Sequence, residues 1–90
     1  FLECKDKGVS LGEKSNGNFE DIKIYDSKYG IVSKDSSVAN IFELYGKNIS
    51  EFCLSSYKKK QEFGGGKINF KNIRCDNKFY NDEFSTISKN

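Results

Sequence analysis

The stretch Asn18-Phe19-Glu20-Asp21-Ile22-Lys23 decides the fold, because the chain repeats it. It returns as Asn69-Phe70-Lys71-Asn72-Ile73-Arg74, and a looser copy, Asn40-Ile41-Phe42-Glu43-Leu44-Tyr45, lies between them. Self-similarity with a period of about 20–50 residues is typical of architectures made of stacked units. The repeat therefore predicts a scaffold and says little about a reaction.

A second segment shares the same spacing. Gly8–Ser15 aligns without a gap to Gly30–Ser37 at an offset of 22 residues, which is also the offset from Asn18 to Asn40. Two different segments with one period are much harder to obtain by chance than one. The register predicts stacked side chains, listed here: Val9 with Ile31 and Cys53, Ser33 with Ser55, and Ile22 with Leu44 and Ile73.

The spacing from Asn40 to Asn69 is 29 residues, seven more than the period. The extra residues fall in the polar, glycine-rich stretch 56–66. Repeat proteins place insertions in loops on one face. The sequence therefore predicts a loop at 56–66, between the third and fourth units.

Within each unit, short apolar runs alternate with polar residues and end at Gly, Asn, Asp or Ser, which indicates short strands. Corresponding strands of successive coils would pair in parallel sheets. We therefore expect an all-β fold, a right-handed parallel β-helix of about four coils with one loop insertion. The chain would be a single segment, 1–90, of a longer protein, with coils at about 1–17, 18–39, 40–68 and 69–90.

An alternative is a small α+β domain. Apolar residues between 39 and 57 also recur near helical spacing, so this stretch could form an amphipathic helix. Gly46, Asn48 and Ser50 are poor residues for the middle of a helix, however. A helix also leaves the 22-residue register unexplained.

The segment Lys28–Ser37 resembles the recurrent x-G-I-x-x-x-x-x-S coil of the pectin-lyase-like superfamily, and Asp6–Glu13 is similar to the same coil one turn earlier. Tyr57–Gly64 resembles a loop in β-helix segments of bacterial surface proteins, including some beside spore-coat-kinase-like domains. The resemblance covers roughly residues 6–80. The last unit departs from it, since the glycine position falls near Asn81, so we expect a register slip or an irregular cap after Cys75.

The resemblance implies a parallel β-helix but does not select an activity, because the superfamily includes lyases, hydrolases, epimerases and non-catalytic adhesins. We expect a non-catalytic scaffold or carbohydrate-binding segment of a bacterial surface or secreted protein. The alternative is part of a polysaccharide-active enzyme (lyase, hydrolase or epimerase) whose catalytic coils lie elsewhere. We assign no catalytic residue to this segment.

The predicted loop provides the binding candidates. Its lysine run could contact an acidic polysaccharide or another anion, with aromatic rings beside it. A solvated, flexible loop is the alternative. The candidate residues are Tyr57, Lys58, Lys59, Lys60, Glu62 and Phe63.

Glu13 and Asp35 are the candidates for a metal. The 22-residue register stacks them in a row with Tyr57, and two carboxylates on neighbouring coils could hold calcium. They also fall at a predicted turn, where solvated charges are normal. We therefore expect no cofactor, with calcium as the one exception that these residues allow.

Composition excludes several functions. The 90 residues contain 15 Lys and Arg, 13 Asp and Glu, and no His, with acids and bases interspersed. This is not the basic stripe of a nucleic-acid-binding protein. No stretch reaches the 18 apolar residues of a membrane span. Ser/His and Cys/His dyads are impossible without histidine.

The three cysteines, Cys4, Cys53 and Cys75, form no C-x-x-C pair and no zinc pattern. We expect buried free thiols, which behave as small apolar groups. One disulfide is the alternative if the protein is secreted.

Asn18, Asn40 and Asn69 would stack at equivalent corners and bond backbone groups that corners leave unpaired. Open ends of the solenoid would leave strand edges unpaired, so we expect flanking coils or self-association.

Overall fold

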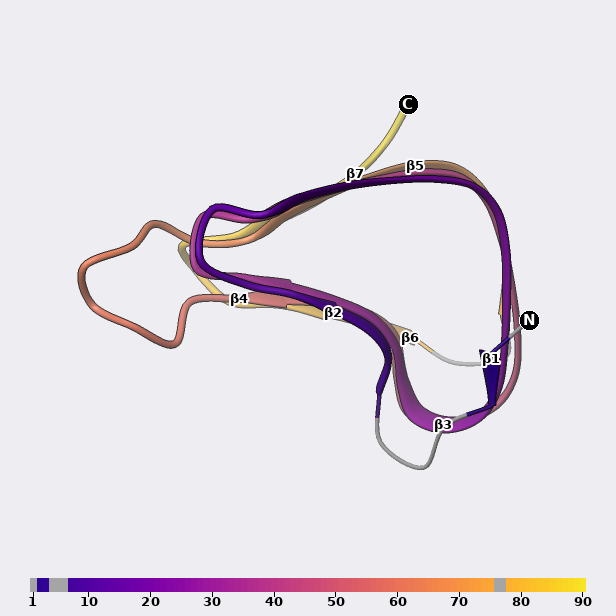
Figure 1. The fold of residues 1–90 in the computed structure, drawn as a ribbon. Helices are drawn as coiled ribbons and strands as arrows, with labels where there is room; N and C mark the ends of the chain where they lie inside the picture. Colours follow the sequence, from indigo (N-terminus) through magenta and orange to yellow (C-terminus); the bar gives the residue numbers. More distant parts are fainter. Residues whose placement is uncertain (1, 4–6, 76–77) are drawn as a thin grey trace.

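The computed structural model describes residues 2–3, 7–75 and 78–90, and these form a parallel β-solenoid of about four turns (Figure 1). The predicted all-β coil fold with a period of about 22 residues is confirmed. The strands are β1 (Leu2–Glu3), β2 (Lys7–Leu11), β3 (Asn16–Lys34), β4 (Val38–Tyr57), β5 (Lys67–Cys75), β6 (Lys78–Asn81) and β7 (Thr86–Lys89).

All strand pairs are parallel, because each coil returns to the position of the one before it. β4 lies between β3 on one side and β5 and β6 on the other, and β7 extends the sheet beyond β5. The alternative with a helix over 39–57 is wrong, since this stretch belongs to β4. Among the described residues there is no helix long and apolar enough to cross a membrane.

The predicted register holds through the first half of each coil. Asn18 pairs with Asn40 and Asn40 with Asn69, and Ile22, Leu44 and Ile73 stack in one row. The amides form a ladder in which Asn40 Nδ2 donates to Asn18 Oδ1 at 3.1 Å and Asn69 Nδ2 to Asn40 Oδ1 at 2.9 Å. The expectation that these asparagines mark corners is wrong. They lie within strands, on the outer surface, and bond one another.

The register changes in the second half. Ser27 pairs with Ile49, yet Tyr29 pairs with Phe52, so β4 contains one extra residue between them. This is a β-bulge, which bends the strand and re-aims the side chains beyond it. It follows a corner at which Asp26 has a φ of 55°, the left-handed conformation that Asp and Asn tolerate better than most residues.

Two predicted stacks are therefore wrong by one residue. Ile31 pairs with Leu54, not with Cys53, and Ser33 pairs with Ser56, not with Ser55. The stack of Val9 on Ile31 is correct.

The core is narrow and lies inside the coils. Its buried apolar side chains come mainly from β3 and β4, the two central turns. They are Ile24, Ile31, Ala39, Ile41, Leu44, Ile49, Cys53, Leu54 and Ile68. At the end of the coil near the turns, the interior is filled by serines, and Ser33 Oγ lies 2.6 Å from Ser37 Oγ. Hydrogen bonds of this kind make a buried hydroxyl tolerable.

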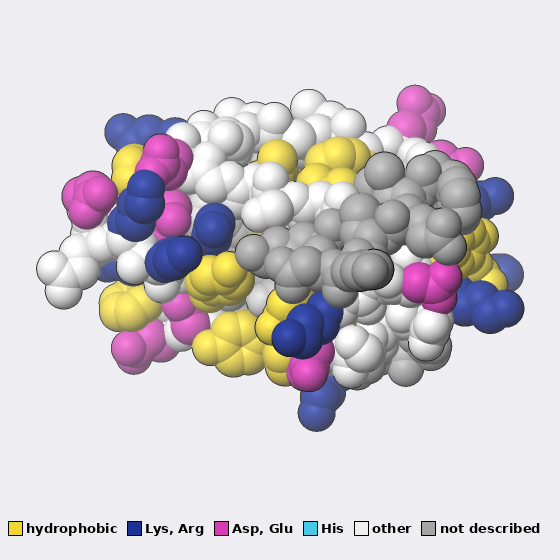
Figure 2. Space-filling view, turned by 60° about the horizontal axis from the view of Figure 1, so that its bottom comes forward, with side chains coloured by type: hydrophobic (Ala, Val, Ile, Leu, Met, Phe, Trp, Pro, Cys, Tyr) yellow, Lys and Arg dark blue, Asp and Glu magenta, His cyan; other side chains and the backbone are white. Residues whose placement is uncertain are grey.

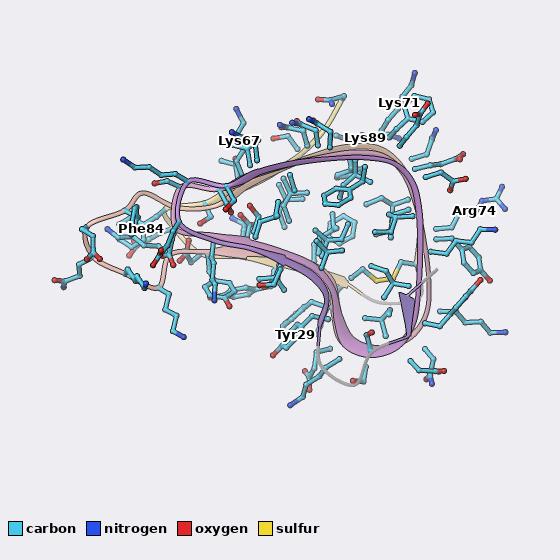
Figure 3. The ribbon with its side chains drawn as sticks, viewed as in Figure 1. Tyr29, Lys67, Lys71, Arg74, Phe84 and Lys89 are labelled. Carbon is cyan, nitrogen blue, oxygen red and sulfur yellow. A yellow bond between two sulfur atoms is a disulfide. The ribbon has the colours of Figure 1, made fainter. Side chains whose placement is uncertain are left out.

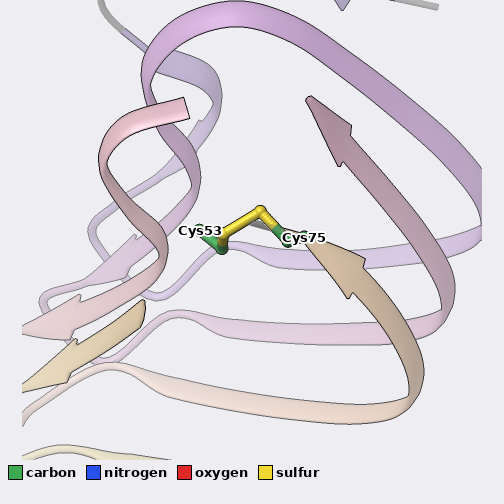
Figure 4. The surroundings of a disulfide bond; sticks show 2 residues. All are labelled: Cys53 and Cys75. Carbon is green, nitrogen blue, oxygen red and sulfur yellow. A yellow bond between two sulfur atoms is a disulfide. The ribbon is translucent and has the colours of Figure 1, made fainter. Parts of the chain in front are cut away.

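Cys53 and Cys75 form a disulfide across the interior of the third coil (Figure 4). Their Cα atoms lie 6.3 Å apart, within the usual range for a disulfide. The expectation of free thiols at these positions is wrong. Cys53 is a core residue as expected, but the parallel coil also brings Cys75 against it. Cys4 lies outside the described residues.

The insertion is a loop from Lys58 to Gly66, between β4 and β5, and it protrudes from one end of the coil (Figure 1). The last unit then follows another irregularity. Phe52 pairs with Lys78 and Leu54 with Phe79, so Asn81 lies beside Ser56. β7 pairs with β5 and completes the fourth turn.

Candidate functional site

An aromatic row runs across the outer surface of the coils. The rings of Tyr29 and Phe52 are stacked, with centroids 6.3 Å apart and planes 19° from parallel. Phe52 and Tyr80 follow at 5.5 Å with planes tilted by 36°. Figure 3 shows Tyr29 outside the coil, where the ribbon bends inward. Three successive coils thus each contribute one ring to the row.

The row lines an open groove of about 510 Å³. Val32 and Ser55 are buried and form its floor, since they stand side by side on neighbouring strands. The complete lining is Lys28, Tyr29, Val32, Phe52, Ser55, Tyr57, Lys58, Tyr80 and Asp82. Figure 2 shows the mixture of hydrophobic and basic side chains on this side of the molecule. The groove therefore combines apolar rings with hydroxyl and charged groups at its rim.

One end of the groove is fixed by Asp82. Its Oδ2 accepts the backbone N–H of Lys58 at 2.8 Å, and its Oδ1 accepts that of Phe84 at 3.1 Å. Burial alone would raise the pKa of Asp82, but these N–H donors, the Ser85 hydroxyl and the Lys58 charge lower it below its ordinary value. Asp82 is therefore an ionised hydrogen-bond acceptor near neutral pH.

The predicted binding residues separate into two groups. Tyr57 and Lys58 line the groove, although the Lys58 ammonium lies 4.6 Å from the ring centroid of Phe84. The other four lie in the protruding loop. Of these, Lys60 forms an ion pair with Glu13, and Phe63 lies under the Lys14 ammonium at 6.0 Å.

Lys59 and Glu62 are exposed, and neither lines the groove.

Asp35 has a structural position that its place in a turn did not suggest. It is only 1% exposed, and its Oδ1 accepts the backbone N–H of Lys59 at 2.7 Å and of Lys60 at 2.8 Å. Burial would raise the pKa of Asp35, but these two donors and nearby lysine charges lower it. Asp35 holds the start of the inserted loop against the preceding coil.

The predicted row of Glu13, Asp35 and Tyr57 does not form as expected, because Tyr57 pairs with Lys34 after the bulge. Glu13 and Asp35 do occupy equivalent turns, with φ of 48° and 53°. Their carboxylates face different partners, a lysine ammonium and two backbone amides. Within the described part of the chain, no three Asp, Glu or Cys residues form a group that could hold a metal ion.

Tyr29, Phe52 and Tyr80 were not among the residues that the sequence pattern singled out. With the 22-residue offset, Tyr29 falls beside Glu51, and no aromatic row is visible. With the offset of 23 residues that the bulge imposes, Tyr29 meets Phe52. The signal was present, but the register hid it.

Comparison with known proteins gives no relative from which a function could be transferred: no protein-family model, no curated protein and no solved structure matches the chain.

Proposed function

We propose that this chain is a non-catalytic β-helical scaffold segment that binds carbohydrate in the groove of Tyr29, Phe52 and Tyr80. The aromatic row is the observation on which the proposal rests. Exposed rings on a rigid surface offer flat apolar area, on which the C–H face of a pyranose can stack, and tyrosine adds a hydroxyl. The row repeats once per coil, so a linear polysaccharide could occupy several rings at once.

The rim of the groove supports the same ligand class. Sugars are recognised by apolar stacking together with a few placed polar groups. Here Tyr57 and Tyr80 offer hydroxyls, Lys28 a donor, and Asp82 an acceptor. The floor belongs to paired strands, so the groove is preformed and loses little conformational entropy when a ligand binds.

The carboxylates near the groove favour binding without turnover. Asp82 and Asp35 both have lowered pKa values, because backbone N–H groups bind their ionised forms. A general acid needs a pKa near the working pH, and burial without such donors is the usual way to raise it. The chain also contains no histidine. A segment of a polysaccharide-active enzyme remains the competing hypothesis, and an activity assay separates the two.

We further propose a secreted or cell-surface location in a bacterium, and kinship with the pectin-lyase-like superfamily. The Cys53–Cys75 disulfide supports the location, since structural disulfides persist in oxidising compartments. The kinship is supported by the coil architecture and by the Gly30-Ile31 coil motif.

A glycan array tests the proposal directly. The chain should bind one class of polysaccharide, and Tyr80→Ala should weaken that binding. Tyr80 is 43% exposed, so its truncation should leave the fold intact. Tyr45→Ala is the matched control, because Tyr45 is 38% exposed and stacks on Tyr25 on a different outer face. Equal loss in both variants, or no binding at all, would refute the assigned groove.

A lyase assay, by absorbance of unsaturated product with and without calcium, tests the competing hypothesis. No turnover is expected on any polysaccharide that binds. Turnover abolished by Asp82→Asn would replace the scaffold with an enzyme.

A further inference from the structure

The two ends of the solenoid differ in charge, and each presents an edge. We call Asn16–Lys23 of β3 the head edge, and Lys71–Cys75 of β5 with Thr86–Lys89 of β7 the tail edge. Within the described residues, the head edge pairs with β4 only, and the tail edge has strand partners on one side only. Unpaired backbone groups of this kind are a template for another strand.

Both edges also leave apolar side chains incompletely covered. Ile22 at the head edge and Ile73 at the tail edge are half-buried, whereas Leu44, between them in the same row, is only 2% exposed. A further coil on either edge would bury this row as the central coil is buried. The same holds for Phe19, whose neighbour Ile41 is 3% exposed.

The charges of the two edges are complementary. The head edge contains two carboxylates, Glu20 and Asp21, and one lysine. The tail edge contains two lysines and one arginine, and no carboxylate. Glu20 and Lys71 belong to the same row, with Phe42 between them, and all three line one shallow depression of the outer surface. Placed on a tail edge, Glu20 would lie beside Lys71 of another copy.

We propose that copies of this chain stack head to tail, so that the tail edge of one adds a parallel coil to the head edge of the next. Ile73 would then meet Ile22, and Ser88 would extend the ladder of Asn18. The methylenes of Lys89, which stands in the row of Phe19, would cover that ring, as lysine stems cover apolar surface elsewhere.

The charges select this orientation over the two symmetric ones. Head to head, the carboxylates of the two copies would face each other, and tail to tail, the cations would. Like charges placed across an interface are strongly unfavourable. A contact between two different edges does not close on itself, so it produces a linear series of copies rather than a dimer.

Sedimentation velocity of the 90-residue chain, with its disulfide intact, tests this proposal. The average mass should rise with concentration beyond a dimer and fall with added salt, which screens exposed charges. Lys71→Glu and Glu20→Lys should each weaken association by roughly tenfold or more. The double reversal E20K/K71E should restore it, because the edges are again complementary. Glu43→Lys, in the central coil, is the matched control and should have no effect.

Circular dichroism of each variant verifies that it is folded, and an equimolar mixture of the two single variants provides an independent measurement. The mixture should form heterodimers, since the altered head of one fits the altered tail of the other. A monomer at all concentrations, a closed dimer that does not grow, or association that survives both single reversals would overturn the proposal.

Discussion

The buried carboxylate of Asp35 accepts the backbone N–H of Lys59 at 2.7 Å, and so ties the inserted loop to the turn of the preceding coil. The same oxygen also accepts the N–H of Lys60. A carboxylate is well suited to this position, because one ionised oxygen can serve two donors that would otherwise be buried without an acceptor.

Asp35→Asn should therefore destabilise the fold. The amide oxygen can still accept a hydrogen bond, but the negative charge is lost, and hydrogen bonds to charged groups contribute about 1.5–3 kcal/mol. Denaturant unfolding should show a loss in that range. Asp21→Asn, at an exposed position on β3, is the control and should change stability little. Equal losses would mean that the loop contacts are unimportant.

Stability should fall in acid. Asp35 and Asp82 have folded-state pKa values below the ordinary value of 3.8, so their ionised forms stabilise the folded state above that pH. The unfolded chain binds protons first as the pH falls, and the contribution is lost progressively below about pH 5. Melting temperatures from pH 7 to pH 2 should show this decline. In the double variant D35N/D82N the decline should be shallower, and an identical decline would contradict the assignment.

Removal of the disulfide should destabilise the last coil. Cys53 and Cys75 are 22 residues apart, and closing a loop of this size stabilises by about 3 kcal/mol in the chain-entropy description. Ser substitution of both residues should lower the free energy of unfolding by this order, and reductant should do the same for the native chain. Mass spectrometry after alkylation of the unreduced protein should show both thiols protected. Labelling of either cysteine would contradict the pairing.

The asparagine ladder should contribute modestly. Asn40→Leu removes two amide–amide hydrogen bonds, one to each neighbouring coil, but the ladder lies on the outer surface where water can replace them. We expect a loss of about 1 kcal/mol. Ser50→Leu, an exposed change on the same strand, is the control for the added apolar surface. A loss no larger than the control's would show that the ladder is not stabilising.

The sequence predicted the coil because Asn18, Asn40 and Asn69 repeat with their apolar neighbours, and parallel coils require equivalent residues to stack. It did not predict the bulge. Ser33 finds a serine at both candidate offsets, Ser55 and Ser56, so the pattern matched equally well in the wrong register.

That single residue determined what could be said about the site. A one-residue slip exchanges the two faces of a strand, so the row of Tyr29 and Phe52 was hidden while the loop after Tyr57 drew the attention. The disulfide was hidden for a different reason. Cys53 and Cys75 face each other across a coil, and a linear pattern does not report distances across an interior.

The most direct test of the central claim is an NMR titration of the chain, labelled in its Tyr and Phe rings, with an oligosaccharide of the class that the glycan array identifies. The ring signals of Tyr29, Phe52 and Tyr80 should shift together and saturate, while those of Tyr25 and Tyr45, stacked on another face, should remain in place. Shifts confined to Tyr25 and Tyr45, or the absence of any saturable shift in the row, would contradict the account.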